Sequence, residues 1–225
     1  DNHRNQHDLA SRLVIFDCDG VLVDSEGLGN TVFAEMLADF GHKISSDESK
    51  SRFRGMKLGV CLEILERETG IELPDCFETD LRQRMSSAFQ AELQPVDGAL
   101  RLVESLKVPF CVASSGPRKK IEDNLQTTNL YPHFDGKIFS GYEVGSWKPD
   151  PGLFLSAAEH FGVAPKDCVV IEDSFVGVSA GVAADMTVLG LSSGEDDKPV
   201  VAAHKIFASL DEIHEFFVAQ DLSHQ

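Results

Sequence analysis

Two pairs of carboxylates follow short apolar runs in this sequence. Asp17 and Asp19 come after "LVIF", and Glu172 and Asp173 come after "CVVI". A turn or helix-capping role is the usual one for such an aspartate, but a cap explains only one member of the second pair. Four carboxylates brought together repel one another unless a cation lies between them, and ligand sets made only of oxygen suit Mg²⁺. The pattern therefore predicts a magnesium site formed by Asp17, Asp19, Glu172 and Asp173.

A second group of polar residues has the composition of a phosphate site. Ser114, Ser115 and Gly116 follow the apolar run 110–113 and precede a proline at a plausible helix start. Hydroxyls and free backbone N–H groups at a helix start bind phosphate, although the same residues also serve as an ordinary helix cap. Lys148 stands in the turn "SWKPDP". A lone lysine before a proline usually lies on the surface.

The elements that must position these residues are strands and helices in alternation. Each apolar run after the first follows a helical stretch, a pattern typical of a parallel sheet with helices on both faces. In such sheets ligands bind beyond the carboxyl ends of the strands. The sequence therefore predicts an α/β fold with a Rossmann-like parallel sheet. Its strands are expected at 13–16, 110–113, 137–140, 168–171 and 187–189.

Residues 17–109 separate the first predicted strand from the second, too many for a single crossover helix. Apolar residues at helical spacing end at Gly41 and Gly70, and a third helical stretch follows Pro74. We therefore predict an all-helical cap domain, 27–91, inserted into a core domain made of 1–26 and 92–225.

The composition restricts the partners. The chain has 225 residues, and its 20 Lys and Arg against 37 Asp and Glu give a net charge of −17. This charge opposes binding to nucleic acid or to an anionic membrane surface. No apolar stretch approaches the roughly 20 residues that span a bilayer, and the polar start lacks the apolar stretch of a secretion signal. The five cysteines form no C-x-x-C pair, which suits free thiols. We expect a cytoplasmic protein that is a monomer or a weak homo-oligomer.

Four motifs, in this order, resemble those of the haloacid dehalogenase superfamily of aspartyl-nucleophile phosphotransferases. They are "DCDGVLVDSE", "VASSG", "WKPDP" and "VVIEDS". The helical insert after the first motif is similar to the branch that contains β-phosphoglucomutase and small sugar-phosphate phosphatases. Within this branch, "FSGYEVGSWKPDP" and "FRGMK" look most like bacterial 6-phosphogluconate phosphatase-type proteins. The resemblance covers nearly the whole chain.

The resemblance implies two carboxylate roles and a metal. Asp17 is expected to be the nucleophile that forms an aspartyl-phosphate, and Asp19 the acid and base for the two proton transfers. Mg²⁺ is expected to be held by Asp17, Asp173, Glu172 and the backbone carbonyl of Asp19, which would orient and neutralise the phosphoryl group.

The resemblance also implies which groups bind the substrate, a small phosphorylated metabolite. Lys148 and Ser114 are expected to bind the remaining phosphate oxygens, assisted by backbone N–H groups near Ser115 and Gly116. In the cap, Arg54 and Lys57 suit a second anionic group such as a carboxylate or phosphate. Solvated surface charges are an equally good interpretation of these two cations.

Three other functions are alternatives to that of a phosphoric monoester hydrolase. A haloacid dehalogenase needs no general acid and lacks the second aspartate, so Asp19 disfavours it. A non-catalytic binding protein would be expected to have lost an active-site carboxylate or lysine, and none is missing. The β-phosphoglucomutase pattern has an arginine where this chain has Leu58 and a histidine where it has Gly29. The prediction is therefore a Mg²⁺-dependent sugar-phosphate phosphatase, with a sugar-phosphate mutase as the alternative.

Overall fold

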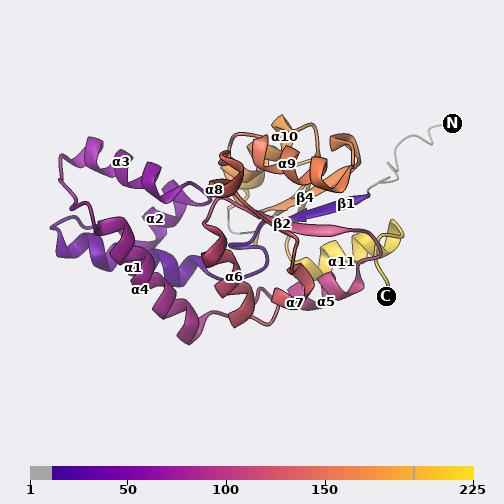
Figure 1. Cartoon of the computed structure of the whole chain (residues 1–225), viewed down its shortest axis with the longest axis horizontal. Helices are drawn as coiled ribbons and strands as arrows, with labels where there is room; N and C mark the ends of the chain where they lie inside the picture. The colour runs from indigo at the N-terminus through magenta and orange to yellow at the C-terminus, as the bar shows by residue number, and fades with distance from the viewer. Residues whose placement is uncertain (1–11, 195) are drawn as a thin grey trace.

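The strands form one parallel sheet with helices on both faces (Figure 1). The computed structural model describes residues 12–194 and 196–225, so the expectation for the polar start lies outside the described residues except at its last position. The sheet order is β3-β2-β1-β4-β5-β6. Its strands are β1 (Leu13–Phe16), β2 (Phe110–Ser114), β3 (Ile138–Ser140), β4 (Cys168–Glu172), β5 (Thr187–Leu191) and β6 (Lys205–Phe207).

Each face of the sheet has its own apolar layer. Val14 and Phe16 of β1 pack in one layer, whereas Leu13 and Ile15 pack in the other. The first layer is covered by α5 (Ala99–Ser105), α6 (Arg118–Thr127), α7 (Tyr131–Phe134) and α11 (Leu210–Ala219), and the second by α9 (Gly152–Phe161) and α10 (Phe175–Ala183). All four residues of β1 are fully buried. Because the sheet is covered on both faces, its strands are apolar along their whole length, which explains the unbroken apolar runs of the sequence.

Four helices between β1 and β2 form a separate lobe, seen at the left of Figure 1. We call these helices the cap and the sheet with its own helices the core. The cap helices are α1 (Glu26–Asp39), α2 (Ser46–Phe53), α3 (Leu58–Thr69) and α4 (Phe77–Glu92). Their buried apolar side chains make a third cluster that includes Phe33, Leu65 and Leu81. The sequence analysis missed α2, which buries only Ser49 and Phe53 and so has no apolar stripe.

One strand was also missed. The edge strand β6 has three residues, of which Lys205 and Ile206 are exposed and only Phe207 is buried. Such a short segment carries little apolar signal. The remaining short helical elements are α8 (Gly141–Val144) and the 3₁₀ turns Pro165–Asp167 and Lys198–Val200. Within the described residues, no helix is both long and apolar enough to cross a membrane.

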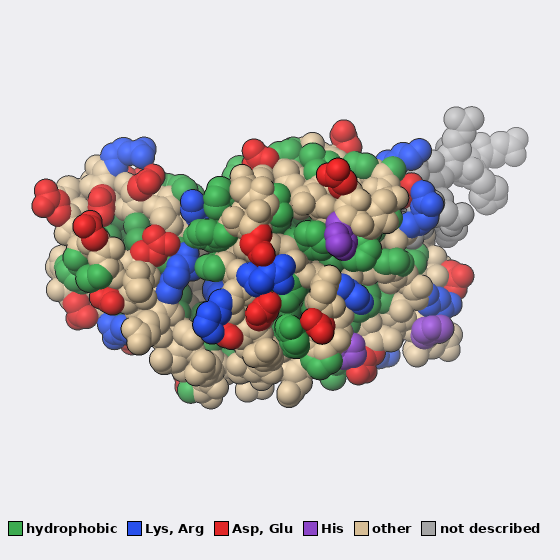
Figure 2. All heavy atoms as spheres, in the orientation of Figure 1, with side chains coloured by type: hydrophobic (Ala, Val, Ile, Leu, Met, Phe, Trp, Pro, Cys, Tyr) green, Lys and Arg blue, Asp and Glu red, His purple; other side chains and the backbone are tan. Residues whose placement is uncertain are grey.

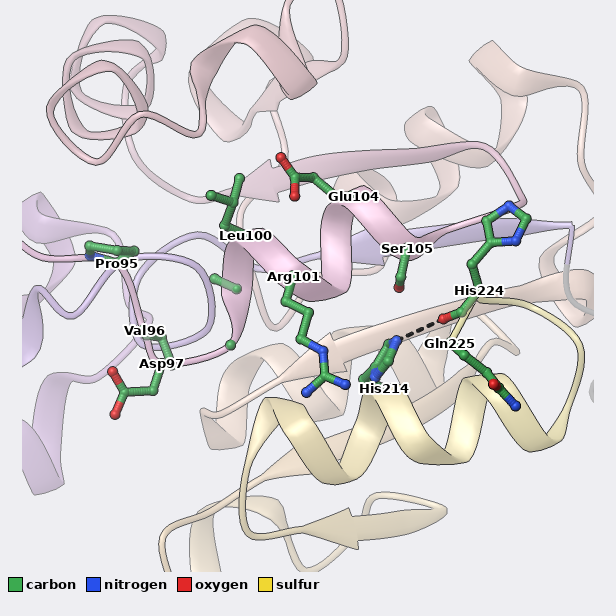
Figure 3. A pocket seen from close by; sticks show the side chains of 12 residues that line it. Pro95, Val96, Asp97, Leu100, Arg101, Glu104, Ser105, His214, His224 and Gln225 are labelled. Carbon is green, nitrogen blue, oxygen red and sulfur yellow. Dashed lines mark hydrogen bonds between the residues drawn. The ribbon is translucent and has the colours of Figure 1, made fainter.

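A hollow of about 590 Å³ lies between α5 and the last residues of the chain (Figure 3). The ring nitrogen Nε2 of His214 lies 2.9 Å from the His224 carbonyl, and the lining residue Arg101 pairs at 3.8 Å with Asp211, which lies outside the lining. None of the site residues expected from the sequence lines this hollow. They lie at the carboxyl ends of the strands.

Candidate active site

The order of the strands brings the motifs together. β1 lies between β2 and β4, with Phe16 opposite Val112 on one side and opposite Ile171 on the other. Asp17 therefore leaves β1 beside the last residues of the two neighbouring strands, Ser114 and Glu172. Side chains from three segments far apart in the sequence meet at this one edge of the sheet.

Lys148 lies inside the core rather than on its surface. Its Nζ donates to Asp17 Oδ1 at 2.8 Å, to Glu172 Oε1 at 2.5 Å and to the Ala113 carbonyl at 3.0 Å. Burial alone would lower the pKa of this lysine, but the two carboxylates outweigh that effect and raise it. Lys148 is therefore a fixed positive charge between Asp17 and Glu172.

The two oxygens of the Asp17 carboxylate have different surroundings. Oδ1 accepts from Lys148 and from the Cys18 backbone N–H, the latter at 2.8 Å. Oδ2 accepts no hydrogen bond from any residue that the structure describes. Asp17 is also only 6% exposed. One oxygen thus anchors the side chain, and the other is available to an electrophile or a cation.

Asp173 is a buried carboxylate without a hydrogen-bond donor. Neither side-chain oxygen has a hydrogen-bond partner among the described residues, although Arg54 Nε lies 3.6 Å from Oδ2. Burial, the contact with Glu26 and the charge of Asp17 raise the pKa of Asp173 well above its usual value. A Cβ at Gly20 would lie 1.9 Å from Asp173 Oδ2, so Gly20 keeps this space open. A buried carboxylate with open acceptor atoms is a fit for a bound cation.

Asp17, Glu172 and Asp173 make an oxygen cluster in which one ligand atom of each residue lies within 4.8 Å of the others. Glu172 already has partners: Lys148 at Oε1, and at Oε2 the Asp173 N–H at 3.1 Å and the Ser174 hydroxyl at 3.2 Å. Burial and the nearby Asp17 raise the pKa of Glu172 to about 7. This donor set suits a divalent cation of the hard, oxygen-binding kind.

The side chain of Asp19 points away from this cluster. Ser25 donates to its Oδ1 at 2.6 Å, and Lys120 donates to its Oδ2 at 3.1 Å. Burial opposes ionisation of Asp19, but Lys120 and Ser25 outweigh it and lower its pKa. The sequence analysis did not identify Lys120. The sequence shows three consecutive cations in "PRKK", but it does not show where each side chain points.

The loop after β2 is held by its own hydrogen bonds. Ser114 Oγ accepts from the Gly116 N–H at 3.1 Å, and the Gly116 carbonyl accepts from the Ser140 hydroxyl at 2.6 Å. Ser115 Oγ accepts from the Lys148 N–H at 3.3 Å. The loop thus ties the segment of Lys148 to the end of β2. The Gly116 N–H, expected to assist phosphate binding, is engaged with Ser114.

Both cap cations expected to meet substrate have partners in the core. Arg54 donates to the Asp173 carbonyl at 3.0 Å and pairs with Glu26, the first residue of α1. Lys57 Nζ lies 3.8 Å from the centre of the Trp147 ring. These contacts connect the cap to the core beside the carboxyl ends of the strands.

A cavity of about 160 Å³ lies between cap and core. Its charged lining residues are two carboxylates, Asp19 and Glu26, and two cations, Arg54 and Lys120, and its apolar lining includes Phe33 and Phe89. Lys57 is not among the lining residues. Figure 2 shows the surface hollowed between the two lobes, with Lys and Arg side chains gathered where they meet. The lining thus carries equal numbers of opposite charges, and its two cations, Arg54 and Lys120, are the groups available to pair with an anionic ligand.

Comparison with known proteins gives three informative similarities in addition to a family match. A family model described as haloacid dehalogenase-like hydrolase matches residues 11–185. The 6-phosphogluconate phosphatase of Escherichia coli (strain K12) is 35% identical over 189 residues, 84% of this chain and 86% of that one. The structure of a conserved haloacid dehalogenase-like protein from Agrobacterium tumefaciens matches with a TM-score of 0.81 at 30% identity, covering 94% and 99% of the two chains. A putative β-phosphoglucomutase from Thermotoga maritima matches with a TM-score of 0.73 at 27% identity, covering 92% and 99%.

Proposed function

The chain belongs to the haloacid dehalogenase-like hydrolases, and from this premise we propose that it is a phosphatase acting on a small phosphorylated sugar or sugar acid. The observation that carries the proposal is that two neighbouring carboxylates have different surroundings. Asp17 is buried against Lys148 with one oxygen open, whereas Asp19 faces the cavity between cap and core. A nucleophile and a separate proton donor are what the cleavage of an alkyl phosphate requires.

In the first step, Asp17 Oδ2 attacks phosphorus and the P–O bond to the alcohol breaks. The electron pair of that bond stays on the alcohol oxygen, which takes a proton from the Asp19 carboxyl group. Because the hydrogen bonds from Lys120 and Ser25 lower the pKa of Asp19, its carboxyl group must leave these two donors before it can hold that proton. The products are an aspartyl-phosphate on Asp17 and the free alcohol. General acid catalysis of this kind contributes roughly a hundred- to ten-thousandfold in rate.

In the second step, water attacks the phosphorus of the aspartyl-phosphate and gives a proton to Asp19. Inorganic phosphate leaves, and the Asp17 carboxylate and the Asp19 acid are restored. Lys148 neutralises the charge of the phosphoryl group in both steps, and the Ser114 hydroxyl donates to one of its oxygens.

We assign the metal site to Asp17, Asp173 and Glu172, with the backbone carbonyl of Asp19 as a further ligand. Mg²⁺ bound there would neutralise and orient the phosphoryl group. The open oxygens of Asp173 support this assignment, because a buried carboxylate without a donor is costly unless a cation compensates it.

The size of the cavity supports a small leaving group. The cavity has a volume of about 160 Å³, below the roughly 300–1,000 Å³ of pockets that hold drug-sized ligands. This suits a short polyol or a sugar acid. Arg54 lines the cavity and enters the proposal as a ligand for a second anionic group. Lys57 remains a candidate only at the rim, since it lies over Trp147.

The test is a panel of sugar phosphates, phosphosugar acids and p-nitrophenyl phosphate with Mg²⁺, using the wild type, Asp17→Asn and Asp24→Asn. Asp24 is an exposed carboxylate close to the same motif, so its variant controls for the chemical change. We expect Asp17→Asn to lose roughly a thousandfold or more in kcat, with Asp24→Asn unchanged. An Asp17→Asn protein that keeps most of its turnover would refute the proposal.

The second candidate is a sugar-phosphate mutase, favoured by the structural match to a putative β-phosphoglucomutase. Against it, Gly29 and Leu58 line the cavity at the two positions where the mutase pattern has a histidine and an arginine. Supplying β-glucose 1-phosphate and following both glucose 6-phosphate and free phosphate separates the two candidates. Isomerisation faster than phosphate release would establish the mutase.

A further inference from the structure

One face of α1 lines the cavity between cap and core. Four residues of this helix are lining residues: Glu26, Gly29, Asn30 and Phe33. Their spacing of three and four positions places them on the same side of the helix. Glu26 pairs with Arg54, which also contacts the core, whereas Phe33 belongs to the apolar cluster of the cap. Asn30 lies between Glu26 and Phe33, one helical turn beyond Glu26. An uncharged polar side chain is thus in the middle of this face.

The cap helices contribute few uncharged polar side chains to this cavity. Among the described residues, Asn30 of α1 and Ser49 of α2 are the only ones apart from the Cys61 thiol. Most of the other lining residues of these helices are apolar, as Phe53 and Phe89 are. Ser49 is only 1% exposed. Because a buried polar side chain is costly unless it forms hydrogen bonds, the partners of this serine matter.

Asn30 and Ser49 form a pair that fixes the orientation of the Asn30 amide. Asn30 Nδ2 donates to the Glu26 carbonyl at 2.8 Å, and Asn30 Oδ1 accepts from the Ser49 hydroxyl at 2.5 Å. Since a carbonyl oxygen can only accept, the amide nitrogen must face Glu26 and the amide oxygen must face Ser49. The amide nitrogen has two hydrogens, and the amide oxygen has two lone pairs. One hydrogen and one lone pair of Asn30 are therefore left for a ligand.

We propose that Asn30 is a specificity-determining residue that binds a hydroxyl group of the leaving alcohol, and that Ser49 positions its amide. The inference rests on the proposed phosphatase function and names its substrate class, the phosphate esters of polyhydroxy alcohols. A hydroxyl group both donates and accepts, so it can use the free N–H and the free lone pair of Asn30. Arg54 and Lys120 suit an anionic group instead. Recognition by Asn30 is therefore expected for neutral and acidic polyol phosphates alike.

This role has a signature in the choice of substrate. Sorbitol 6-phosphate and 6-phosphogluconate share a row of hydroxyl groups and differ in a terminal carboxylate. The leaving group of p-nitrophenyl phosphate has no free hydroxyl group before cleavage, so it has no contact with Asn30 to lose. Loss of the Asn30 amide should therefore impair both polyol phosphates to a similar degree and spare p-nitrophenyl phosphate.

The experiment measures kcat/KM on these three substrates for Asn30→Leu, Asn30→Ala and Ser49→Ala. Thr31→Val and Ser51→Ala are the matched controls, because both side chains are exposed on the same two helices and donate to carbonyls of their own helix. We expect both Asn30 variants to lose roughly ten- to a hundredfold on the polyol phosphates and less than about threefold on p-nitrophenyl phosphate. Ser49→Ala should show the same selectivity with a smaller loss, because the amide keeps one of its two partners.

Equal losses on all three substrates would overturn the inference, since they would make the pair a structural link between α1 and α2. Unchanged kcat/KM in both Asn30 variants, the same losses in Thr31→Val, or a loss confined to 6-phosphogluconate would overturn it as well. A wild type that hydrolyses p-nitrophenyl phosphate but neither polyol phosphate would refute the inference and leave the protein a phosphatase. A wild type without Mg²⁺-dependent turnover of any of the three would instead refute the proposed function, and the inference with it.

Discussion

Single charged groups decide what this site can do. Lys148 neutralises Asp17 and Glu172 by direct hydrogen bonds, and the carboxylate of Asp173 is left with no donor. Burial and neighbouring carboxylates raise the pKa of Glu172 to about 7 and that of Asp173 well above its usual value, so protonation of these groups is favoured when no cation is bound. A cation between Asp17 and Asp173 would favour the ionised carboxylates and supply the fixed charge that a phosphoryl group needs.

A metal-ligand variant tests this balance. Asp173→Asn removes one ligand charge at almost constant volume, so we expect the Mg²⁺ concentration for half-maximal activity to rise roughly tenfold or more. EDTA should stop the wild type, and Mg²⁺ should restore it. In thermal unfolding, Mg²⁺ should raise the melting temperature of the wild type but barely change that of Asp173→Asn, whereas Asp24→Asn should respond like the wild type. Full turnover in chelator would remove the metal from the mechanism.

The sequence identifies the residues at the strand ends but not their partners across the chain. Asp17, Glu172 and Asp173 follow from apolar runs that end in carboxylates, which is a local pattern. Lys120 donates a hydrogen bond to Asp19, which lies 101 positions away in the sequence. No spacing rule indicates that the third cation of "PRKK" points toward Asp19. The direction of the Lys120 side chain depends on how α6 continues from the loop after β2, which is a property of the packed fold.

At the scale of elements, the segment before α9 joins the two lobes. Trp147 precedes Lys148 in sequence, packs edge-on against Tyr142 with ring centres 5.3 Å apart, and receives the Lys57 ammonium of the cap. Arg82 of the cap also donates to the Tyr142 hydroxyl at 2.9 Å. These contacts thus join the cap to the segment that carries Lys148.

This coupling can be measured with a double-mutant cycle of Lys57→Met and Trp147→Leu. A cation–π contact at such a site contributes about 0.5–1 kcal/mol, so each variant should raise KM by roughly two- to fivefold, and the double variant should be no worse than the single ones. Arg52→Met is the control, because Arg52 stacks on Phe53 within the cap.

The choice of substrate separates the two roles of Lys57. Equal effects on p-nitrophenyl phosphate and on a phosphosugar acid would support a contact that holds the cap. Effects confined to the acid would make Lys57 a ligand for its second anion, and strictly additive effects of Lys57→Met and Trp147→Leu would contradict the coupling.

The sequence predicts elements where apolar periodicity is strong. Five of the six strands and three of the four cap helices were located in this way, with β2 and β4 each extending slightly beyond its predicted end to include Ser114 or Glu172. The polar helix α2 and the exposed edge strand β6 have no such periodicity. Tertiary contacts, rather than local pattern, define these two.

For the molecule as a whole, burial controls the reactivity of the thiols. Four of the five cysteines are buried, and burial raises the pKa of Cys61 to about 12 and that of Cys168 to about 11. Cys76, before α4, is exposed. Since the thiolate is the reactive form, the buried thiols should be nearly inert in the folded protein.

Labelling with a chromogenic disulfide should therefore release one equivalent of dye rapidly from the native protein and five after denaturation. Cys76→Ser should abolish the rapid phase while leaving phosphatase activity intact. Rapid reaction of two or more thiols in the native state would contradict the burial of the other four cysteines.

The two-lobed arrangement follows from the long interval between β1 and β2. The face that each lobe presents to the other does not follow from the sequence. Arg54 and Lys57 were expected to face substrate, and their contacts with Asp173 and Trp147 depend on how the lobes meet. Contacts of this kind between the two lobes leave no periodic pattern in the sequence.

The most direct test of the central claim is to trap the covalent intermediate. In Asp19→Asn, p-nitrophenol can still depart without a proton, but the attack of water lacks its base, so an aspartyl-phosphate should accumulate. After mixing with p-nitrophenyl phosphate and Mg²⁺ and quenching in acid, peptide mass spectrometry should find one added phosphoryl group on Asp17 and none in the double variant Asp17→Asn, Asp19→Asn. A burst of p-nitrophenol without a phosphorylated peptide, or with the phosphoryl group on another residue, would contradict Asp17 as the nucleophile.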